Sequence, residues 1–159
     1  FISGIGNYKV KKSVSAICKM ENRAKLNSKK VLMNFQKKVI QNRIKLTALL
    51  NKLKKMGKKI IVLSAPAKGM TLLNYCKIDK DFVDYATEKS SIKQNLYTPG
   101  GNIPVYSDDK ILKSKPDYAL LLAWNFSKEI INNNMQYLKR GGKFIIPIPN
   151  IRIISYKKK

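Results

Sequence analysis

The sequence predicts an α/β fold: a Rossmann-like parallel sheet with helices on both faces, preceded by a long amphipathic helix. Two patterns support this prediction. From residue 59 onward, short and almost unbroken apolar runs alternate with segments of helical character. Strands that are apolar on both sides are typical of a parallel sheet covered on both faces. Before residue 59, apolar residues recur at helical spacing over residues 28–56.

Residues 28–56 are the longest periodic stretch, and we predict one amphipathic helix that ends at Gly57. Spacings of three, four and seven residues place six apolar side chains on one face: Leu32, Phe35, Val39, Leu46, Leu49 and Leu53. Lysines fill the opposite face. We expect the apolar face to pack against the core and the lysines to stay in solvent. A basic arm that binds nucleic acid or a membrane is the alternative.

The later apolar runs predict strands at residues 59–63, 82–87, 118–123 and 143–148, with a further candidate at 151–155. Helices are predicted between them at 71–76, 107–113 and 127–138. The first 26 residues have weaker patterns: FISGIGNYKV is compatible with a strand, and residues 13–20 with the start of a short helix. Gly4 and Gly6 resemble half of a dinucleotide-binding fingerprint, whose third glycine is absent.

The charge of the chain is strongly unbalanced, with 33 Lys and Arg residues, 9 Asp and Glu residues and a formal net charge of +24. Such a positive field attracts polyanions, including nucleic acids, acidic lipid surfaces and nucleotide phosphates. The lysines are nevertheless scattered through every segment, as codon bias in an A/T-rich genome would also produce. The charge leaves both interpretations open.

The residue types that are absent exclude several kinds of site. The sequence has no His, so this chain contains no His-based catalytic triad, His-bound zinc or histidine general base. Cys18 and Cys76 match no metal-ligand spacing, and we expect free thiols in a reducing compartment. No apolar run is long enough to span a membrane, and the first residues do not resemble a signal peptide. We therefore expect a cytoplasmic protein without a metal site.

Ligands of open parallel sheets bind beyond the carboxyl ends of the strands, and residues 64–71 form the first such loop. Lys68 and the free N–H groups where Thr71 begins the predicted helix would suit a phosphate or pyrophosphate, with Gly69 in the turn between them. The motif is not a P-loop, because GxxxxGK[ST] is absent and Lys68 precedes its glycine. A surface lysine beside a structural turn is the alternative.

A second candidate loop covers residues 87–101. Glu88 stands at the end of a predicted strand, where an acid could bind sugar or ribose hydroxyls. Lys93, Tyr97 and Thr98 follow on a loop of a length that is often functional in compact domains. A variable surface loop is the alternative.

A third candidate is the pair Trp124 and Asn125, directly after the strand predicted at 118–123. An indole and an amide at a strand end could stack on, and hydrogen-bond to, a base or a sugar. In the alternative interpretation, Trp124 closes the edge of the core and Asn125 caps the next helix.

Four segments of the sequence, in order, resemble the C-terminal domain of the S-adenosylmethionine-dependent C-methyltransferases, which methylate carbons of nucleotide-linked deoxysugars. These segments are KKIIVLSAPAKGMTLLNYC, KQNLYTPGGNIPV, PDYALLLAWNFSKEI and GGKFIIPIP. The resemblance covers residues 59–149, and SVSAICKMENRAKL with the long helix resembles the family's linker into this domain. It implies a remnant or linker of an upstream methyltransferase domain at 1–26, a Rossmann-like substrate-binding domain at 27–156 and a basic tail at 157–159.

The resemblance implies that this chain is the last part of a three-part enzyme, after a zinc-binding N-terminal domain and a central methyltransferase domain. In such enzymes the nucleotide-sugar lies between the central and C-terminal domains. S-adenosylmethionine and the catalytic residues, including the family's histidines, belong to the central domain. The chain would then bind no cofactor and be inactive alone. Its partners would be the nucleotide-sugar and the upstream methyltransferase domain.

The resemblance implies roles only for residues that would contact the substrate. The positions that match AKGNTLLNY, KQGLYTPGT and LAWNF include Lys68, Gly69, Thr71, Asn74, Lys93, Tyr97, Thr98, Pro99, Gly100, Trp124 and Asn125. The departures from the family pattern are Ser64 and Asn95 in place of glycines, Met70 for asparagine, Glu88 for aspartate and Asn102 for histidine. The loss of a polar group at position 70 and of a titratable group at position 102 implies that affinity or substrate choice differs from the family's.

We therefore expect a domain that binds a nucleotide-linked deoxysugar and orients it for methylation at carbon. Lys68 and the helix start would bind the pyrophosphate, Glu88, Lys93 and Tyr97 the sugar or ribose, and Trp124 with Asn125 would line the cleft. A stand-alone basic module that binds nucleic acid is the alternative. A scaffold fragment without activity is a third possibility.

Overall fold

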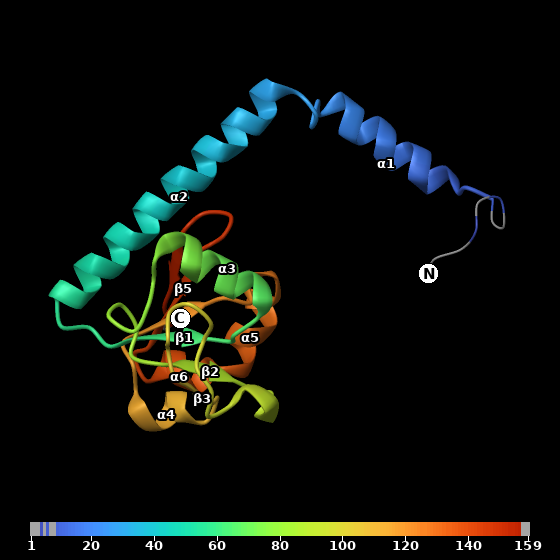
Figure 1. The fold of residues 1–159 in the computed structure, drawn as a ribbon. Coiled ribbons are helices and arrows are strands. Elements are labelled where there is room, and N and C mark those ends of the chain that lie inside the picture. The colour runs from blue at the N-terminus through green and yellow to red at the C-terminus, as the bar shows by residue number, and fades with distance from the viewer. Residues whose placement is uncertain (1–3, 5, 7–8, 157–159) are drawn as a thin grey trace. The chain divides into compact units, whose positions relative to one another are not determined.

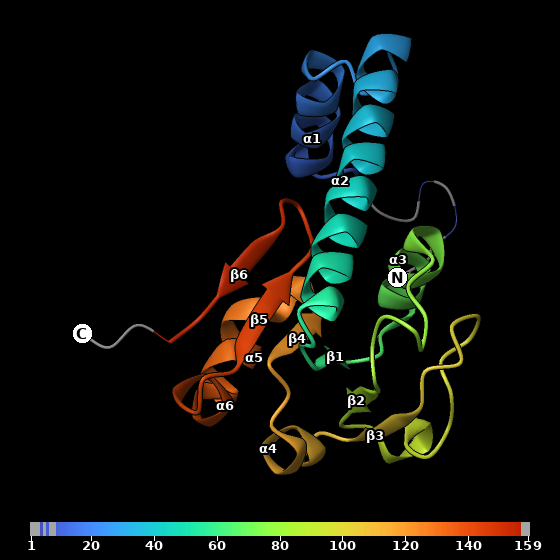
Figure 2. The same cartoon turned by 90° about the vertical axis from the view of Figure 1, so that its left-hand side faces the viewer.

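The computed structural model describes residues 4, 6 and 9–156 and contains a six-stranded sheet of order β3-β2-β1-β4-β5-β6. Figure 2 shows the strands in this order from β3 at the lower right to β6 at the upper left. Their bounds are β1 (Ile60–Leu63), β2 (Ala86–Glu88), β3 (Val105–Ser107), β4 (Tyr118–Leu121), β5 (Lys143–Ile146) and β6 (Arg152–Ile154). Strands β1 to β5 pair in parallel, and β6 is antiparallel to β5. The predicted α/β class is confirmed.

The described helices alternate with these strands along the chain. They are α1 (Lys12–Arg23), α2 (Lys29–Lys55), α3 (Ala67–Cys76), α4 (Lys110–Ser114), α5 (Ser127–Asn133), α6 (Met135–Lys139) and the 3₁₀ turns η1 (Ser91–Lys93) and η2 (Trp124–Phe126). The strand expected in FISGIGNYKV, the half fingerprint around Gly4 and the basic tail 157–159 fall wholly or partly outside the described residues.

Both faces of the sheet are buried, because successive residues of β1 enter two different cores. Ile60 and Val62 pack with residues of α2 and α3. Ile61 and Leu63 pack with residues of α4 and α6 on the opposite face. Figure 1 shows α3 on one side of the strands and α4 and α6 on the other. The prediction of helices on both faces is therefore confirmed, and it explains why the strands are apolar at every position.

The buried residues of α2 all lie in its C-terminal half, so the prediction of one continuous buried apolar face is only partly right. Leu46, Leu50 and Leu53 are buried in the core. Leu32 and Phe35, on the same predicted face, remain 56% and 65% exposed.

Two predicted elements differ from the structure for local reasons. The strand predicted at 82–87 begins only at Ala86, because the amides of Phe82 and Val83 both donate to the carbonyl of Asp79 and form a turn. The helix predicted at 127–138 is interrupted at Asn134, whose side-chain amide donates to the Ile130 carbonyl at 2.8 Å. A short polar side chain that bonds to the backbone competes with helix continuation in this way.

Residue contacts divide the chain into two units, 1–40 and 41–159, with the division inside α2. In the first unit, α1 has no buried residues. In the second, Gly57 ends α2 with a φ of +70°, a conformation that glycine adopts without strain. Cys18 and Cys76 are both free thiols. No helix in the described part of the chain has the length and apolar character needed to cross a membrane.

The division of α2 can be tested with two matched substitutions. Leu50→Ala removes a side chain that is fully buried and should lower the free energy of unfolding by about 2–5 kcal/mol. Leu32→Ala should change it by less than about 0.5 kcal/mol, because Leu32 is exposed. Urea denaturation of both variants measures the difference. Equal losses would show that the N-terminal half of α2 packs as tightly as the C-terminal half.

Candidate functional site

The order of the sheet reverses at β1, which has β2 on one side and β4 on the other. The parallel register pairs Leu63 with Leu121, so the segments that follow β1 and β4 leave the same edge of the sheet at adjacent positions. Such a reversal leaves a crevice beyond the carboxyl ends of the two strands, and ligands of open α/β sheets bind there. We call this the carboxyl edge of the sheet.

Lys68, Trp124 and Asn125 meet at the carboxyl edge. Lys68 lies in the first turn of α3, and the other two residues form the start of η2. The Lys68 ammonium lies 4.7 Å from the centroid of the Trp124 ring and donates a hydrogen bond to Asn125 Oδ1. A cation over an indole face is held by the ring's negative potential. The structure therefore brings two of the three predicted loops into one cluster.

Glu88 ties the second predicted loop to the first. Its Oε2 atom accepts a hydrogen bond from the Ala65 amide at 3.1 Å, and its Oε1 atom accepts from the amides of Lys89 and Ser90 at 2.9 and 3.3 Å. The Lys93 ammonium donates to the Ala65 carbonyl at 3.1 Å and pairs with Glu88 Oε2 at 3.4 Å. The Glu88 carboxylate is thus largely occupied by the chain's own donors.

The pKa of Glu88 reflects this arrangement. Burial by itself would raise it, but the hydrogen bonds from the Ala65 and Ser90 amides and the charge of Lys93 outweigh burial. The pKa of the carboxyl group therefore lies below its ordinary value. Glu88 is a clamp between the ends of β1 and β2 that is stable only while ionised.

Helix α3 begins four residues earlier than the sequence predicted, at Ala67 instead of Thr71. Pro66, with a φ of −75°, precedes its first residue, and its carbonyl accepts hydrogen bonds from the amides of Gly69 and Met70 at 2.8 and 3.1 Å. Proline favours such a helix start because its φ is already close to helical values. Thr71 therefore lies in the second turn, where backbone amides bond within the helix. Within the described part of the chain, the amides of Ala67 and Lys68 at the helix start have no backbone acceptor.

Gly69 is a packing residue inside α3 instead of a turn residue. A Cβ atom at this position would lie 2.7 Å from Leu122 Cβ, closer than two carbon atoms can approach. The absence of a side chain lets α3 lie directly against the end of β4. Gly69 thereby sets the distance between the segment that carries Lys68 and the segment that carries Trp124.

The remaining predicted site residues form a separate group. Asn74 lies six residues after Lys68, which is about 9 Å along the helix. A Cβ atom on Gly100 would overlap the Asn74 amide, so the two residues are in direct contact. Thr98 is buried, and its hydroxyl accepts the Ile103 amide at 3.1 Å. Tyr97 pairs with Pro104 through a β-bridge, and its side chain is 68% exposed. The structure shows these residues closing the loop before β3.

Two polar residues near the carboxyl edge were not predicted as site residues from the sequence. The hydroxyl of Thr87, which is fully buried, and Asp108 Oδ1 have no hydrogen-bond partner among the described residues. Burial raises the pKa of Asp108, and the nearby Thr87 hydroxyl partly offsets this, although the two groups do not reach hydrogen-bond geometry. The sequence feature that could have identified Asp108 is the acidic pair that follows β3 in YSDDK.

Two departures from the family pattern have a backbone explanation. Ser64 and Asn95, which stand where the resembling family has glycine, adopt φ values of +69° and +64°. Glycine enters this region without penalty, whereas a serine is strained there and an asparagine less so. Ser64 connects β1 to α3, so its conformation helps to direct the chain toward Lys68.

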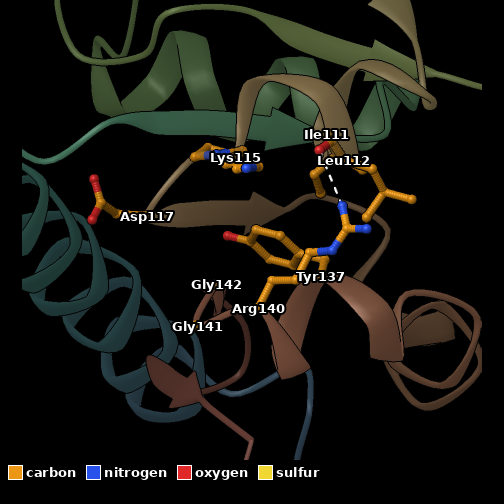
Figure 3. A pocket seen from close by; sticks show the side chains of 9 residues that line it. Ile111, Leu112, Lys115, Asp117, Tyr137, Arg140, Gly141 and Gly142 are labelled. Atoms are coloured by element: carbon orange, nitrogen blue, oxygen red, sulfur yellow. Dashed lines mark hydrogen bonds between the residues drawn. The ribbon is translucent and has the colours of Figure 1, made fainter.

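A small cavity of about 100 Å³ lies at the opposite edge of the sheet, before β4 and β5. Figure 3 shows Tyr137, Asp117 and Arg140 around it, with the Arg140 guanidinium donating to the Leu112 carbonyl at 3.4 Å. None of the predicted site residues lines this cavity. In the described part of the chain, no group of three or more acidic, Cys or His side chains is placed to hold a metal ion.

Comparison with known proteins supports the resemblance seen in the sequence. Residues 4–149 match the family described as the C-methyltransferase C-terminal domain. Over 99 residues, or 62% of the chain, the sequence is 40% identical to the C-methyltransferase NovU of Streptomyces niveus. This alignment covers 24% of NovU, so the chain corresponds to about a quarter of this curated relative.

The Glu88 clamp predicts a pH dependence of stability. Its folded pKa is lowered, so its contribution is fully present above the unfolded pKa of about 4.3 and is lost as the pH falls through the folded value. Glu88→Gln should therefore be less stable than the wild type at neutral pH, with the gap narrowing below about pH 4.3. Urea denaturation as a function of pH measures this gap. Glu129→Gln, at an exposed position of α5, is the control. A gap that stays constant with pH would contradict the clamp.

Relief of strain at position 64 gives a second prediction. Ser64→Gly should raise the free energy of unfolding by several tenths to about 1 kcal/mol, because glycine adopts the observed positive φ without penalty. Asn95→Gly should give a smaller gain, since asparagine tolerates this region better. Thermal unfolding of both variants measures the gains. A Ser64→Gly variant less stable than the wild type would show that the serine side chain stabilises the turn.

Proposed function

The chain belongs to the family of C-methyltransferase C-terminal domains, and from this membership we propose that it binds a nucleotide-linked deoxysugar and orients it for methylation at carbon. The observation that carries the proposal is the Lys68 ammonium, held by Trp124 and Asn125 beside the β1–β4 crevice. No carboxylate among the described residues pairs with Lys68. Its charge therefore remains available to an anionic ligand.

The pyrophosphate of such a ligand is the group that Lys68 would bind. An ammonium offers three N–H donors, one of which goes to Asn125 Oδ1. The amides of Ala67 and Lys68 at the start of α3 add donors on the same side. Lys93 contributes a second positive charge, although its partner Glu88 partly neutralises it. The excess of Lys and Arg over acids raises the local concentration of any polyphosphate ligand.

The other predicted residues take more limited roles in this proposal. Trp124 and Asn125 hold Lys68 and line the crevice, and Glu88 maintains the ends of β1 and β2. Gly69 allows α3 to approach β4. Thr71, Asn74, Tyr97, Thr98 and Gly100 shape α3 and the loop beside it. Holding the substrate in a fixed orientation matters because methyl transfer depends on the alignment of carbon and sulfonium.

S-adenosylmethionine would supply the methyl group in the complete enzyme, but the described residues do not fit it. Its sulfonium is cationic, and the carboxyl edge presents the ammonium groups of Lys68 and Lys93. The positive charges of the sulfonium and of these two ammonium groups would repel each other. We propose that the cofactor and the catalytic residues belong to an upstream methyltransferase domain, with residues 1–26 as the linker to it and 27–156 as the substrate-binding domain.

The proposal is tested by titrating the 159-residue chain with a thymidine diphosphate-deoxysugar in a calorimeter. Lys68→Ala should weaken binding roughly tenfold, as expected for the loss of one charge-assisted hydrogen bond. Lys139→Ala, an exposed lysine of α6, should leave the affinity unchanged.

Two results would contradict the proposed function. One is an affinity of Lys68→Ala equal to that of the wild type. The other is a wild-type chain that prefers a polynucleotide of equal phosphate concentration over the nucleotide-sugar. The second result would favour nucleic-acid binding, and a steep loss of that affinity with salt would accompany it.

A further inference from the structure

The cavity of Figure 3 lies at the edge of the sheet where β4 and β5 begin, which we call the amino edge, and it has no part in the function proposed above. Its volume is about 100 Å³. One water molecule needs about 10–15 Å³ of cavity volume, so a small polyatomic ion fits. Lys115 and Arg140 line this cavity, and both also line a second depression of about 550 Å³. Two positively charged side chains therefore border both hollows.

No acid neutralises these two side chains within the described part of the chain. Asp117 also lines the cavity, but its Oδ1 atom pairs with the Lys58 ammonium at 3.3 Å and its Oδ2 atom accepts the Lys59 amide at 2.9 Å. Figure 3 shows the Asp117 carboxylate pointing away from Arg140. Neither Lys115 nor Arg140 belongs to an ion pair among the described residues. Both charges therefore remain available to an anion.

The Arg140 guanidinium is fixed at the cavity and keeps most of its donors. One of its N–H groups donates to the Leu112 carbonyl at 3.4 Å, and the other N–H groups remain available. The planar fork of a guanidinium matches two oxygens of a phosphate or a carboxylate.

Lys115 occupies a backbone position that disfavours a lysine. It follows α4 with a φ of +47°, in the left-handed region. Glycine adopts this conformation without strain and is the usual residue at such a helix end. The chain thus carries an ammonium at a position where glycine would be more stable, and strain of this kind is found most often at functional sites.

The wall of the cavity is rigid and uncharged. A Cβ atom on Gly142 would overlap the Tyr137 ring, so the absence of a side chain there lets the ring lie against the backbone. The Tyr137 hydroxyl bonds to both the amide and the carbonyl of Lys143 at 3.2 Å. Burial raises the pKa of Tyr137, so the hydroxyl stays neutral at physiological pH and does not repel an anion.

We propose that Lys115 and Arg140 form an anion site, separate from that of Lys68, which binds a phosphate group. Arg140 binds two of the phosphate oxygens, and the Lys115 ammonium binds a third. A phosphate is favoured over a carboxylate because its charge of about −1.5 to −2 at neutral pH matches two cations. The site lies before β4, whereas Lys68 follows β1 at the opposite edge of the sheet. The proposal therefore does not depend on the substrate proposed above.

The site is tested by titrating the ¹⁵N-labelled 159-residue chain with inorganic phosphate at constant ionic strength and following the amide NMR shifts. The amides of Lys115, Arg140 and Gly141 should shift and reach saturation. Arg140→Ala should weaken this binding roughly tenfold, as expected for the loss of a charge-assisted contact. Lys139→Ala, at the exposed neighbouring lysine of α6, should leave it unchanged.

Lys115→Gly separates binding from folding. It removes the ammonium and relieves the backbone strain, so the chain should be at least as stable in urea as the wild type while phosphate binding falls several-fold. Lys68→Ala should leave the shifts of Lys115, Arg140 and Gly141 unchanged. The test is thus independent of the proposed function.

Glycerol 3-phosphate is the second probe, and it separates two sources of the phosphate group. Binding tighter than that of inorganic phosphate would assign the site to a phosphate ester, and equal or weaker binding to the free ion. Shifts that do not saturate, that persist in Arg140→Ala, or that Lys139→Ala reduces equally would indicate diffuse attraction to the basic surface. Any of these three results would overturn the site and leave the proposed function intact.

Discussion

The parallel pairing of β1 with β4 is the contact on which the proposed site depends. It reverses the strand order, so that the segments after β1 and β4 diverge from neighbouring positions and place Lys68 beside Trp124 and Asn125. The pairing is stable because β1 is buried on both faces, by α2 and α3 on one side and by α4 and α6 on the other. Gly69 refines the geometry, since any larger residue would force α3 away from Leu122. The position of the lysine charge therefore follows from the packing of the sheet.

The scarcity of acids determines which lysines can bind a ligand. Two carboxylates near the sheet ends satisfy backbone amides: Glu88 accepts the Ala65 amide, and Asp117 accepts the Lys59 amide at 2.9 Å. The ion pairs found among the described residues join Lys54 to Asp84, Lys58 to Asp117 and Lys93 to Glu88. Lys68 and Lys110 are instead positioned by aromatic rings. Rings hold an ammonium without neutralising it, which is the property that a phosphate-binding lysine requires.

Lys68 and Lys110 follow different strands of the sheet. Lys68 lies at the reversal of the sheet, and Lys110 lies at the edge strand β3 in a depression that Lys113 and Ser114 also line. Between them, the Glu88 clamp occupies the end of β2 and holds Lys93 against Ala65.

The sequence by itself determined the class of fold, the order of its elements and the family, because continuous apolar runs, helical spacing and ordered motifs are local properties of the chain. It located β1, β4 and β5 closely and identified the loops that carry Lys68 and Trp124. Only the tertiary structure decided that α3 starts at Ala67, that Leu32 is exposed while Leu50 is buried, and that Thr98 and Gly100 lie apart from Lys68. It also revealed the cavity at Lys115 and Arg140. These features depend on contacts between residues distant in the sequence, which no local pattern records.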